Sequence, residues 1–152
     1  IGPFVENCVL AHEPTVGARG LALALHRDVP QGAAILGDAG RLQQVFGNLL
    51  SNAVKFTPSG GRIDVWVRTA QNGYEILVRD SGEGIAATAL PHVFERFRQA
   101  DQATSRRHGG LGLGLSIVRQ LVEFHGGRVS ADSEGAGRGA TFTVWLPAAG
   151  TL

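Results

Sequence analysis

Residues 38–56 read DAGRLQQVFGNLLSNAVKF, and this stretch decides the fold prediction. Its apolar side chains recur at helical spacing and would form one stripe: Leu42, Val45, Phe46, Leu49, Leu50 and Ala53. Asp38 stands just before that stripe, where a carboxylate can accept a hydrogen bond from a free N–H of the first turn. The pattern predicts an amphipathic helix that begins after Asp38, ends near Phe56 and buries one face.

The segments around this helix predict strands and two further helices. Strands are expected where apolar residues alternate or form short runs: Leu21–His26, Ala33–Leu36, Arg62–Thr69, Tyr74–Val78, Arg128–Ser133 and Ala140–Leu146. Helices are expected over residues 3–17, with Pro14 disturbing the end, and over residues 111–125, closed by Gly126-Gly127, with a short helical stretch up to Phe97. Hairpins mixed with three helices predict an α+β fold, a two-layer sandwich whose mixed, mostly antiparallel sheet carries the helices on one face.

Two details of the strands bear on that prediction. Asn72-Gly73 lies between two alternating segments and is typical of a hairpin turn. Trp66 and Trp145 fall on the strand face opposite the apolar stripe. They would either cover an open sheet face or mark a docking surface.

Length, charge and cysteine content narrow the class of protein. A chain of 152 residues fits one domain, and 43% apolar residues suffice for a core. The net charge of +1 gives no field that attracts nucleic acid or an anionic membrane, so neither is an expected partner. A single cysteine, Cys8, precludes an internal disulfide and fits a reducing compartment. Without an apolar run of about 20 residues, we expect a cytoplasmic domain, whose parent protein can still be membrane-anchored.

Two segments carry residue types suited to a nucleotide, each with an ordinary structural alternative. Asn48, Asn52 and Lys55 share one stripe of the predicted helix. Carboxamide oxygens suit Mg²⁺ and lysine suits a phosphate, but a solvated helix surface fits the same residues. The motif Asp80-Ser-Gly82-Glu-Gly84 places a carboxylate at a strand end, where it can accept a hydrogen bond from the adenine amino group or simply cap a turn.

Residues 109–115, GGLGLGL, open a predicted helix. Free N–H groups at a helix start bind anions, whereas ordinary turns would also use such glycines. The chain contains no G-x-x-x-x-G-K-[ST] motif, and no Gly-x-Gly-x-x-Gly motif follows a first β-α-β strand, so P-loop and Rossmann sites are poor candidates.

Five motifs in chain order resemble the boxes of sensor histidine kinases. They are the N box at residues 48–56, the G1 box at 80–85, the F box at 94–97, the G2 box at 110–115 and the G3 box at 139–142. The resemblance covers about residues 19–147. It identifies the chain as similar to the catalytic, ATP-binding domain of a two-component histidine kinase, in the gyrase, chaperone, histidine kinase and MutL ATPase superfamily.

The resemblance implies roles for individual residues, with ATP and Mg²⁺ as cofactors. At the phosphate end, Asn52 would ligate Mg²⁺, Asn48 would face the phosphates, Lys55 would contact a phosphate, and Gly110, Gly112, Leu113 and Gly114 would lie beside them. At the base end, Asp80 would accept from adenine, Gly82, Gly84 and Ile85 would line the ring, and Thr141 would support Asp80. Phe94 and Phe97 would anchor an ATP lid formed by residues 98–110.

Two departures from the family pattern are visible. Leu111 stands where the G2 box often has threonine, and no H box is present, because His12-Glu13 is followed by Pro14 and a proline disfavours helix at the preceding residue. The phosphoacceptor histidine is therefore expected outside this chain. Residues 1–18 are interpreted as a helix or linker from the absent dimerisation domain and residues 19–152 as the catalytic domain.

The resemblance implies transfer of the γ-phosphoryl group to a histidine on that dimerisation domain, in a parent kinase that is itself a homodimer. From there it would pass to the receiver domain of a response regulator. A regulatory module that binds nucleotide without transfer is one alternative, although Asn52 would then have no use. An ATPase that drives a conformational cycle usually has a glutamate base at the position of Asn48, whose amide cannot take a proton from water. A serine kinase of the anti-sigma type is a further alternative.

Overall fold

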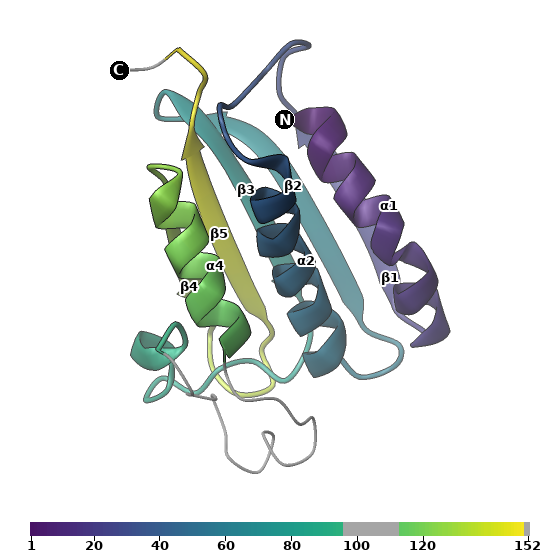
Figure 1. Ribbon diagram of the computed structural model, residues 1–152. Coiled ribbons are helices and arrows are strands. Elements are labelled where there is room, and N and C mark those ends of the chain that lie inside the picture. Colours follow the sequence, from purple (N-terminus) through teal and green to yellow (C-terminus); the bar gives the residue numbers. More distant parts are fainter. Residues whose placement is uncertain (96–112, 151–152) are drawn as a thin grey trace.

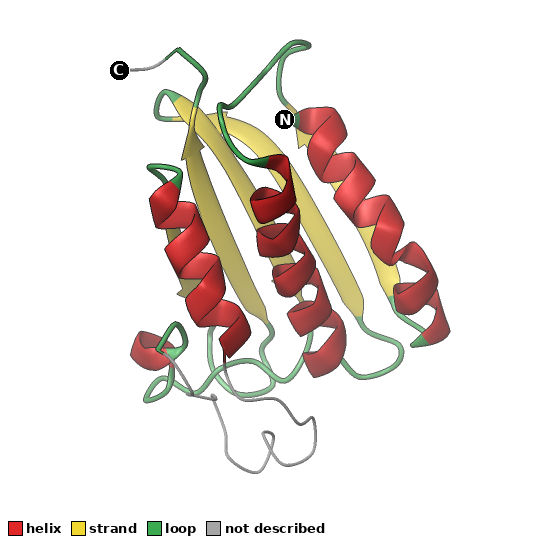
Figure 2. Ribbon diagram, viewed as in Figure 1, coloured by secondary structure: helices red, strands yellow, loops and turns green. Residues whose placement is uncertain are grey.

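The computed structural model describes residues 1–95 and 113–150. Within these residues, three α-helices lie side by side on one face of one sheet (Figures 1 and 2). The helices are α1 (Gly2–Ala18), α2 (Ala39–Phe56) and α4 (Leu113–Phe124), with a short 3₁₀ turn, η1, at Leu90–His92. The strands are β1 (Ala22–Asp28), β2 (Arg62–Ala70), β3 (Gly73–Asp80), β4 (Arg128–Asp132) and β5 (Ala140–Pro147).

The sheet has the order β1-β2-β3-β5-β4. Only β1 and β2 pair in parallel, and the other three pairs are antiparallel. This arrangement confirms the predicted α+β fold with a mixed, mostly antiparallel sheet. Among the described residues, no helix combines the length and the apolar character that crossing a bilayer requires.

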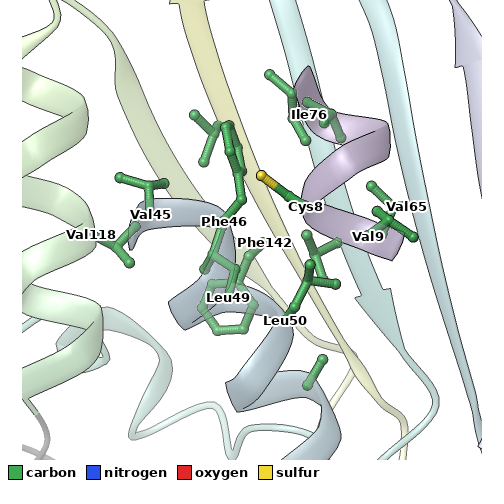
Figure 3. Close-up of a cluster of buried hydrophobic side chains, with 14 of the residues drawn as sticks. Cys8, Val9, Val45, Phe46, Leu49, Leu50, Val65, Ile76, Val118 and Phe142 are labelled. Carbon is green, nitrogen blue, oxygen red and sulfur yellow. The ribbon is translucent and has the colours of Figure 1, made fainter. Parts of the chain in front are cut away.

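Helix α2 lies at the centre of the helical layer and supplies much of the core (Figures 1 and 3). Phe46, Leu49 and Leu50 are each 1% exposed and belong to one cluster with sheet residues such as Ile76 and Phe142. Burying a side chain of this size stabilises a fold by about 1.5–3 kcal/mol. Asp38 caps the helix as predicted, because its Oδ1 accepts from the N–H of Arg41 at 3.0 Å.

Helix α1 runs through Pro14 to Ala18, so the predicted disturbance of its end is wrong, and Glu13 is helical. An interior proline removes one helical hydrogen bond and costs roughly 3 kcal/mol. Val5, Cys8, Val9 and Val16 are all buried in the common core, and Val16 lies beyond the proline. Packing on both sides of Pro14 offsets its cost. Residues 1–18 therefore fold together with the rest of the chain.

The predicted strand at residues 33–36 does not form. A turn closed by the Ala33 N–H on the Pro30 carbonyl leads the chain away from β1, which pairs with β2 instead. The carbonyl oxygens of the segment bond elsewhere, Ala33 accepting from the N-terminal ammonium and Ala34 from the N–H of Ala149. Leu36 is 87% exposed, whereas Ile35 is partly buried against the core, so the run packs through one side chain without forming a strand.

The β2–β3 hairpin forms, but its turn lies one residue earlier than Asn72-Gly73. Gln71 and Asn72 form the turn with positive φ, at 49° and 63°, the two non-glycine residues in the described part of the chain that do so, and Gly73 already pairs with Ala70. A Cβ on residue 73 would lie 2.2 Å from the Leu146 carbonyl oxygen. The glycine therefore serves the close approach of β3 to β5 rather than the turn.

Both tryptophans lie on the sheet face away from the helices, as predicted. The ring of His26 stacks on Trp66 with centroids 4.8 Å apart, and the Arg128 guanidinium lies 4.3 Å from the centroid of Trp145. The Trp145 indole N–H also donates to the Ala70 carbonyl at 2.8 Å. Each ring is half-buried under a neighbouring side chain, so both contribute to covering this face.

Candidate functional site

Four segments that are distant in sequence meet at one end of the molecule. They are the C-terminus of α2, the loop after β3, the turn at residues 133–139 and the start of α4, at the lower end in Figure 1. Backbone hydrogen bonds join three of them, because Glu83 donates to Phe56 at 3.0 Å and Gly139 donates to Gly82 at 3.1 Å. Most of the predicted site residues belong to these segments.

Asp80 is the last residue of β3 and is only 6% exposed. Its Oδ1 accepts a hydrogen bond from the N–H of Gly82 at 2.9 Å. Burial raises the pKa of this carboxyl above its ordinary value, against the opposing effect of backbone hydrogen bonds from Gly82 and Ala140. The sheet thus holds a buried acceptor group in a fixed position, which is what recognition of a base requires.

The glycines after Asp80 are explained by contacts within the protein. A Cβ on Gly82 would lie 2.2 Å from the Phe56 carbonyl oxygen. A Cβ on Gly84, whose φ is +72°, would lie 2.2 Å from the Gly135 carbonyl oxygen. Both glycines therefore let residues 80–85 (the base loop below) lie between α2 and the 133–139 turn. That they also line a bound ring stays a prediction.

The stripe on α2 points toward the start of α4. The Nδ2 of Asn48 donates to the Gly114 carbonyl at 3.4 Å, which brings two predicted phosphate-side residues together. Asn52 and Lys55 are half-buried, and neither side chain has a hydrogen bond or ion pair with any residue in the described part of the chain. Within the described part of the chain, their polar groups are not used by other side chains or by the backbone.

Two more predicted residues are placed by packing. Ile85 is 6% exposed and belongs to the core cluster. The ring of Phe94 packs edge-on against Phe142 of β5, with centroids 6.1 Å apart. Phe97, Gly110, Gly112, the predicted lid at 98–110 and the side chain of Leu113 lie outside the described residues.

Thr141 is the one described residue whose position differs from the expected arrangement. Asp80 pairs with Ala140 across β3 and β5, so these two residues share the helix-covered face. Successive side chains of a strand alternate, and Thr141 therefore lies on the open face. The backbone of Ala140, rather than the Thr141 side chain, is the neighbour that supports the Asp80 carboxylate.

Sequence reasoning missed two side chains that hold this end of the molecule. Thr57 is fully buried, and its hydroxyl donates to the Ala53 carbonyl at 2.6 Å. The hydroxyl of Ser133 accepts from the N–H of Ile85 at 3.0 Å. Thr57 directly follows a predicted helix, and Ser133 ends a predicted strand. At such positions hydroxyl side chains often bond to the backbone.

The described residues contain no group of three or more His, Cys, Asp or Glu side chains arranged to hold a metal ion. Magnesium needs no such cluster, because it keeps several waters and binds one or two protein oxygens together with substrate phosphates. The carboxamide of Asn52, which has no hydrogen-bond partner within residues 1–95 and 113–150, fits that kind of site.

Comparison with known proteins agrees with this geometry. The profile of the family described as "Histidine kinase-, DNA gyrase B-, and HSP90-like ATPase" matches residues 37–150. The sensor-like histidine kinase SenX3 of Mycolicibacterium smegmatis is 37% identical over 147 residues, which are 97% of this chain and 38% of that protein.

Solved structures give the same result. The mycobacterial sensor histidine kinase MprB superposes with a TM-score of 0.82 at 30% identity, over 96% of this chain and 94% of that one. Full-length ShkA in complex with AMPPNP superposes with a TM-score of 0.83 at 32% identity, over 97% of this chain and 30% of that one.

The chain belongs to the histidine kinase-, DNA gyrase B- and HSP90-like ATPase family. Within that family it corresponds to the catalytic domain of sensor histidine kinases of two-component signalling, and the resemblance seen in its five boxes is confirmed. An ATPase domain of this family implies ATP as the nucleotide. The chain spans well under half the length of its curated relatives, 38% in SenX3.

Proposed function

We propose that this domain binds Mg²⁺-ATP and transfers the γ-phosphoryl group to a histidine on a separate dimerisation domain, from which it passes to a response regulator. The observation that carries the proposal is that α2 touches both ends of the candidate site. Its last carbonyl, on Phe56, holds the base loop, and Asn48 reaches the start of α4. From Asn48 to Phe56 the helix rises by about 12 Å, so α2 borders both the base loop and the start of α4, between which the nucleotide would bind.

The residues along this line suit the successive parts of the nucleotide. Asp80 would accept a hydrogen bond from the adenine amino group at the base end. Lys55 and Asn52, both without partners in the described residues, would meet the triphosphate, the lysine as a cation and the asparagine as an oxygen ligand. Bound Mg²⁺ would neutralise charge on the transferring group, and positioning by these side chains would supply much of the catalysis.

Asn48 favours phosphoryl transfer over hydrolysis. It lies one helical turn before Asn52, where a conformational-cycle ATPase of this superfamily would need a general base. Its amide donates to the Gly114 carbonyl and cannot take a proton from water. The nucleophile is therefore proposed to come from another domain.

The partners and the location follow from this proposal. The parent kinase would be a homodimer that carries the phosphoacceptor histidine, and the phosphoryl group would end on an aspartate of a receiver domain. The catalytic domain itself would act in the cytoplasm.

Removal of the proposed Mg²⁺ ligand tests the assignment. Asn52 is half-buried on the flank of α2, so Asn52→Ala should cost little core packing. With a histidine-bearing dimerisation domain added in trans, we expect the variant to give no acid-labile phosphohistidine. Gln43→Ala, which removes an exposed amide from the opposite side of the same helix, should react like the wild type. Wild-type rates from Asn52→Ala would refute the proposal, and an acid-stable product would indicate a serine kinase.

A further inference from the structure

The turn at residues 133–139 holds the base loop through its backbone. Gly137 donates to the Glu83 carbonyl at 2.6 Å, and Gly139 donates to the Gly82 carbonyl at 3.1 Å. At these two points the contact is made by main-chain atoms of glycines, so no side chain of the turn takes part in these bonds. Ser133 adds a contact that depends on a side chain, because its hydroxyl bonds to the base loop at Ile85.

The hydroxyl of Ser133 lies within hydrogen-bond distance of four backbone groups. It accepts from the N–H of Ile85 at 3.0 Å and from the N–H of Gly135 at 3.2 Å. Its proton is directed to the Gly139 carbonyl at 2.6 Å, with the Gly135 carbonyl farther away at 3.3 Å. A serine hydroxyl has one donor and two acceptor sites, so its hydrogen-bonding capacity is fully used. The Ile85 side chain is 6% exposed, so a lost partner would leave its N–H where water has little access.

We propose that Ser133 is a positioning residue for the base of the bound nucleotide. It fixes Ile85, which ends the base loop, relative to Gly139, whose own Cα lies against Asp80: a Cβ there would be 2.2 Å from the Asp80 carbonyl oxygen. The Ser133 hydroxyl thereby sets the distance between the base loop and the start of β5. These two segments together surround the Asp80 carboxylate. The inference rests on the proposed function and deepens it.

This role is specific to one end of the nucleotide. Ser133 bonds only to the base loop and to its own turn, and the phosphate-side stripe of Asn48, Asn52 and Lys55 lies on α2, which Ser133 does not contact through any hydrogen bond among the described residues. Loss of the hydroxyl should therefore weaken binding of the base and leave binding of the phosphates unchanged.

Competition binding to the 152-residue chain tests this inference. Ser133→Ala should weaken ADP binding by roughly three- to tenfold, the effect of one net hydrogen bond, and should reduce the preference for ATP over GTP. Binding of inorganic tripolyphosphate with Mg²⁺ should not change. Ser133→Thr keeps the hydroxyl and should restore ADP binding. The control is Ser130→Ala, since Ser130 is an exposed serine on the open face of β4, the strand that ends just before Ser133.

The outcomes distinguish a failure of nucleotide binding by the domain from a failure of the role proposed for Ser133. A wild-type chain that does not bind ADP overturns the proposed function and this inference with it. A wild-type chain that binds ADP, with Ser133→Ala binding equally well, overturns the inference alone. So does an equal loss of ADP and tripolyphosphate binding, because that indicates a general structural effect. If Ser133→Ala folds poorly, Ser133→Cys replaces the hydroxyl by a weakly hydrogen-bonding thiol and should show the same loss restricted to the base.

Discussion

Replacing Gly82 by alanine would place a methyl group against the end of α2. The new Cβ would lie 2.2 Å from the carbonyl oxygen of Phe56 and 3.0 Å from the Oδ1 of Asp80, whereas ordinary contact begins at 3.4 Å. The base loop would therefore have to move by roughly 1 Å in a densely packed region. Both contacting atoms are held in place, one by the helix and one by the sheet, so neither can yield cheaply.

The size of the effect follows from these contacts. Forcing an extra carbon into a packed site costs about 1–3 kcal/mol. The same carbonyl of Phe56 accepts the N–H of Glu83 at 3.0 Å, and moving the loop loses this bond, worth about 0.5–1.5 kcal/mol. We expect the free energy of unfolding to fall by about 2–4 kcal/mol, which a typical domain survives. Nucleotide binding should be lost, because the Gly82 N–H that orients Asp80 moves with the loop.

Urea unfolding and ADP titration measure the two effects on the same protein. Gly17→Ala is the matched control, because nothing lies within 4 Å of a Cβ added at this helical position. That substitution should be neutral or stabilise the fold by about 0.5–1 kcal/mol. This prediction would be contradicted if the free energy of unfolding of Gly82→Ala stayed within about 0.5 kcal/mol of the wild type and the variant bound ADP normally. A change of that size is usual for an unconstrained surface position.

Two further predictions concern aspartates. Asp38→Ala removes the cap of α2 and should lower the free energy of unfolding by about 1 kcal/mol in the same urea assay; an unchanged midpoint would show that the cap is not used. Burial raises the pKa of Asp80, so its ionisation opposes folding: stability should decline as the pH rises from 3.8 through the raised folded pKa. Asp80→Asn should remove that decline, be more stable than the wild type at pH 7 and lose the preference for ATP over GTP. Urea titrations across this pH range measure the stability, and nucleotide competition measures the preference for ATP. Identical pH dependence of the wild type and Asp80→Asn would contradict the predicted effect of Asp80 ionisation.

The sequence predicts best those elements in which the spacing of apolar residues shows which face is buried. Helix α2 has an uninterrupted apolar stripe and a capping aspartate, and the structure begins and ends it within one residue of the prediction. Asp80 was placed correctly at a strand end, because an alternating segment stops at a glycine-rich motif. In both cases the information is local, so no knowledge of distant contacts is needed.

The structure differs from the sequence-based predictions where contacts between segments distant in sequence determine the local conformation. Pro14 is tolerated because Val16, beyond it, reaches the core. The run at residues 33–36 forms no strand because a turn after β1 redirects the chain and the Ala34 carbonyl bonds to the distant Ala149 N–H. The β2–β3 turn is displaced because Gly73 must approach Leu146. The open-face position of Thr141 depends on strand register, which motif order alone does not determine.

Several glycines of this chain have a physical explanation that composition alone could not give. Among the described glycines, five are positions at which an added Cβ would lie 2.2 Å from a carbonyl oxygen of another segment: Gly73, Gly82, Gly84, Gly127 and Gly139. Three of these, Gly82, Gly84 and Gly139, surround Asp80 and join the base loop to α2 and to the 133–139 turn. Backbones that approach so closely have little freedom to move relative to one another. The glycines at the base end therefore give rigidity rather than flexibility, and this rigidity is what allows a buried, unfavourably ionised carboxylate to stay aimed at one position.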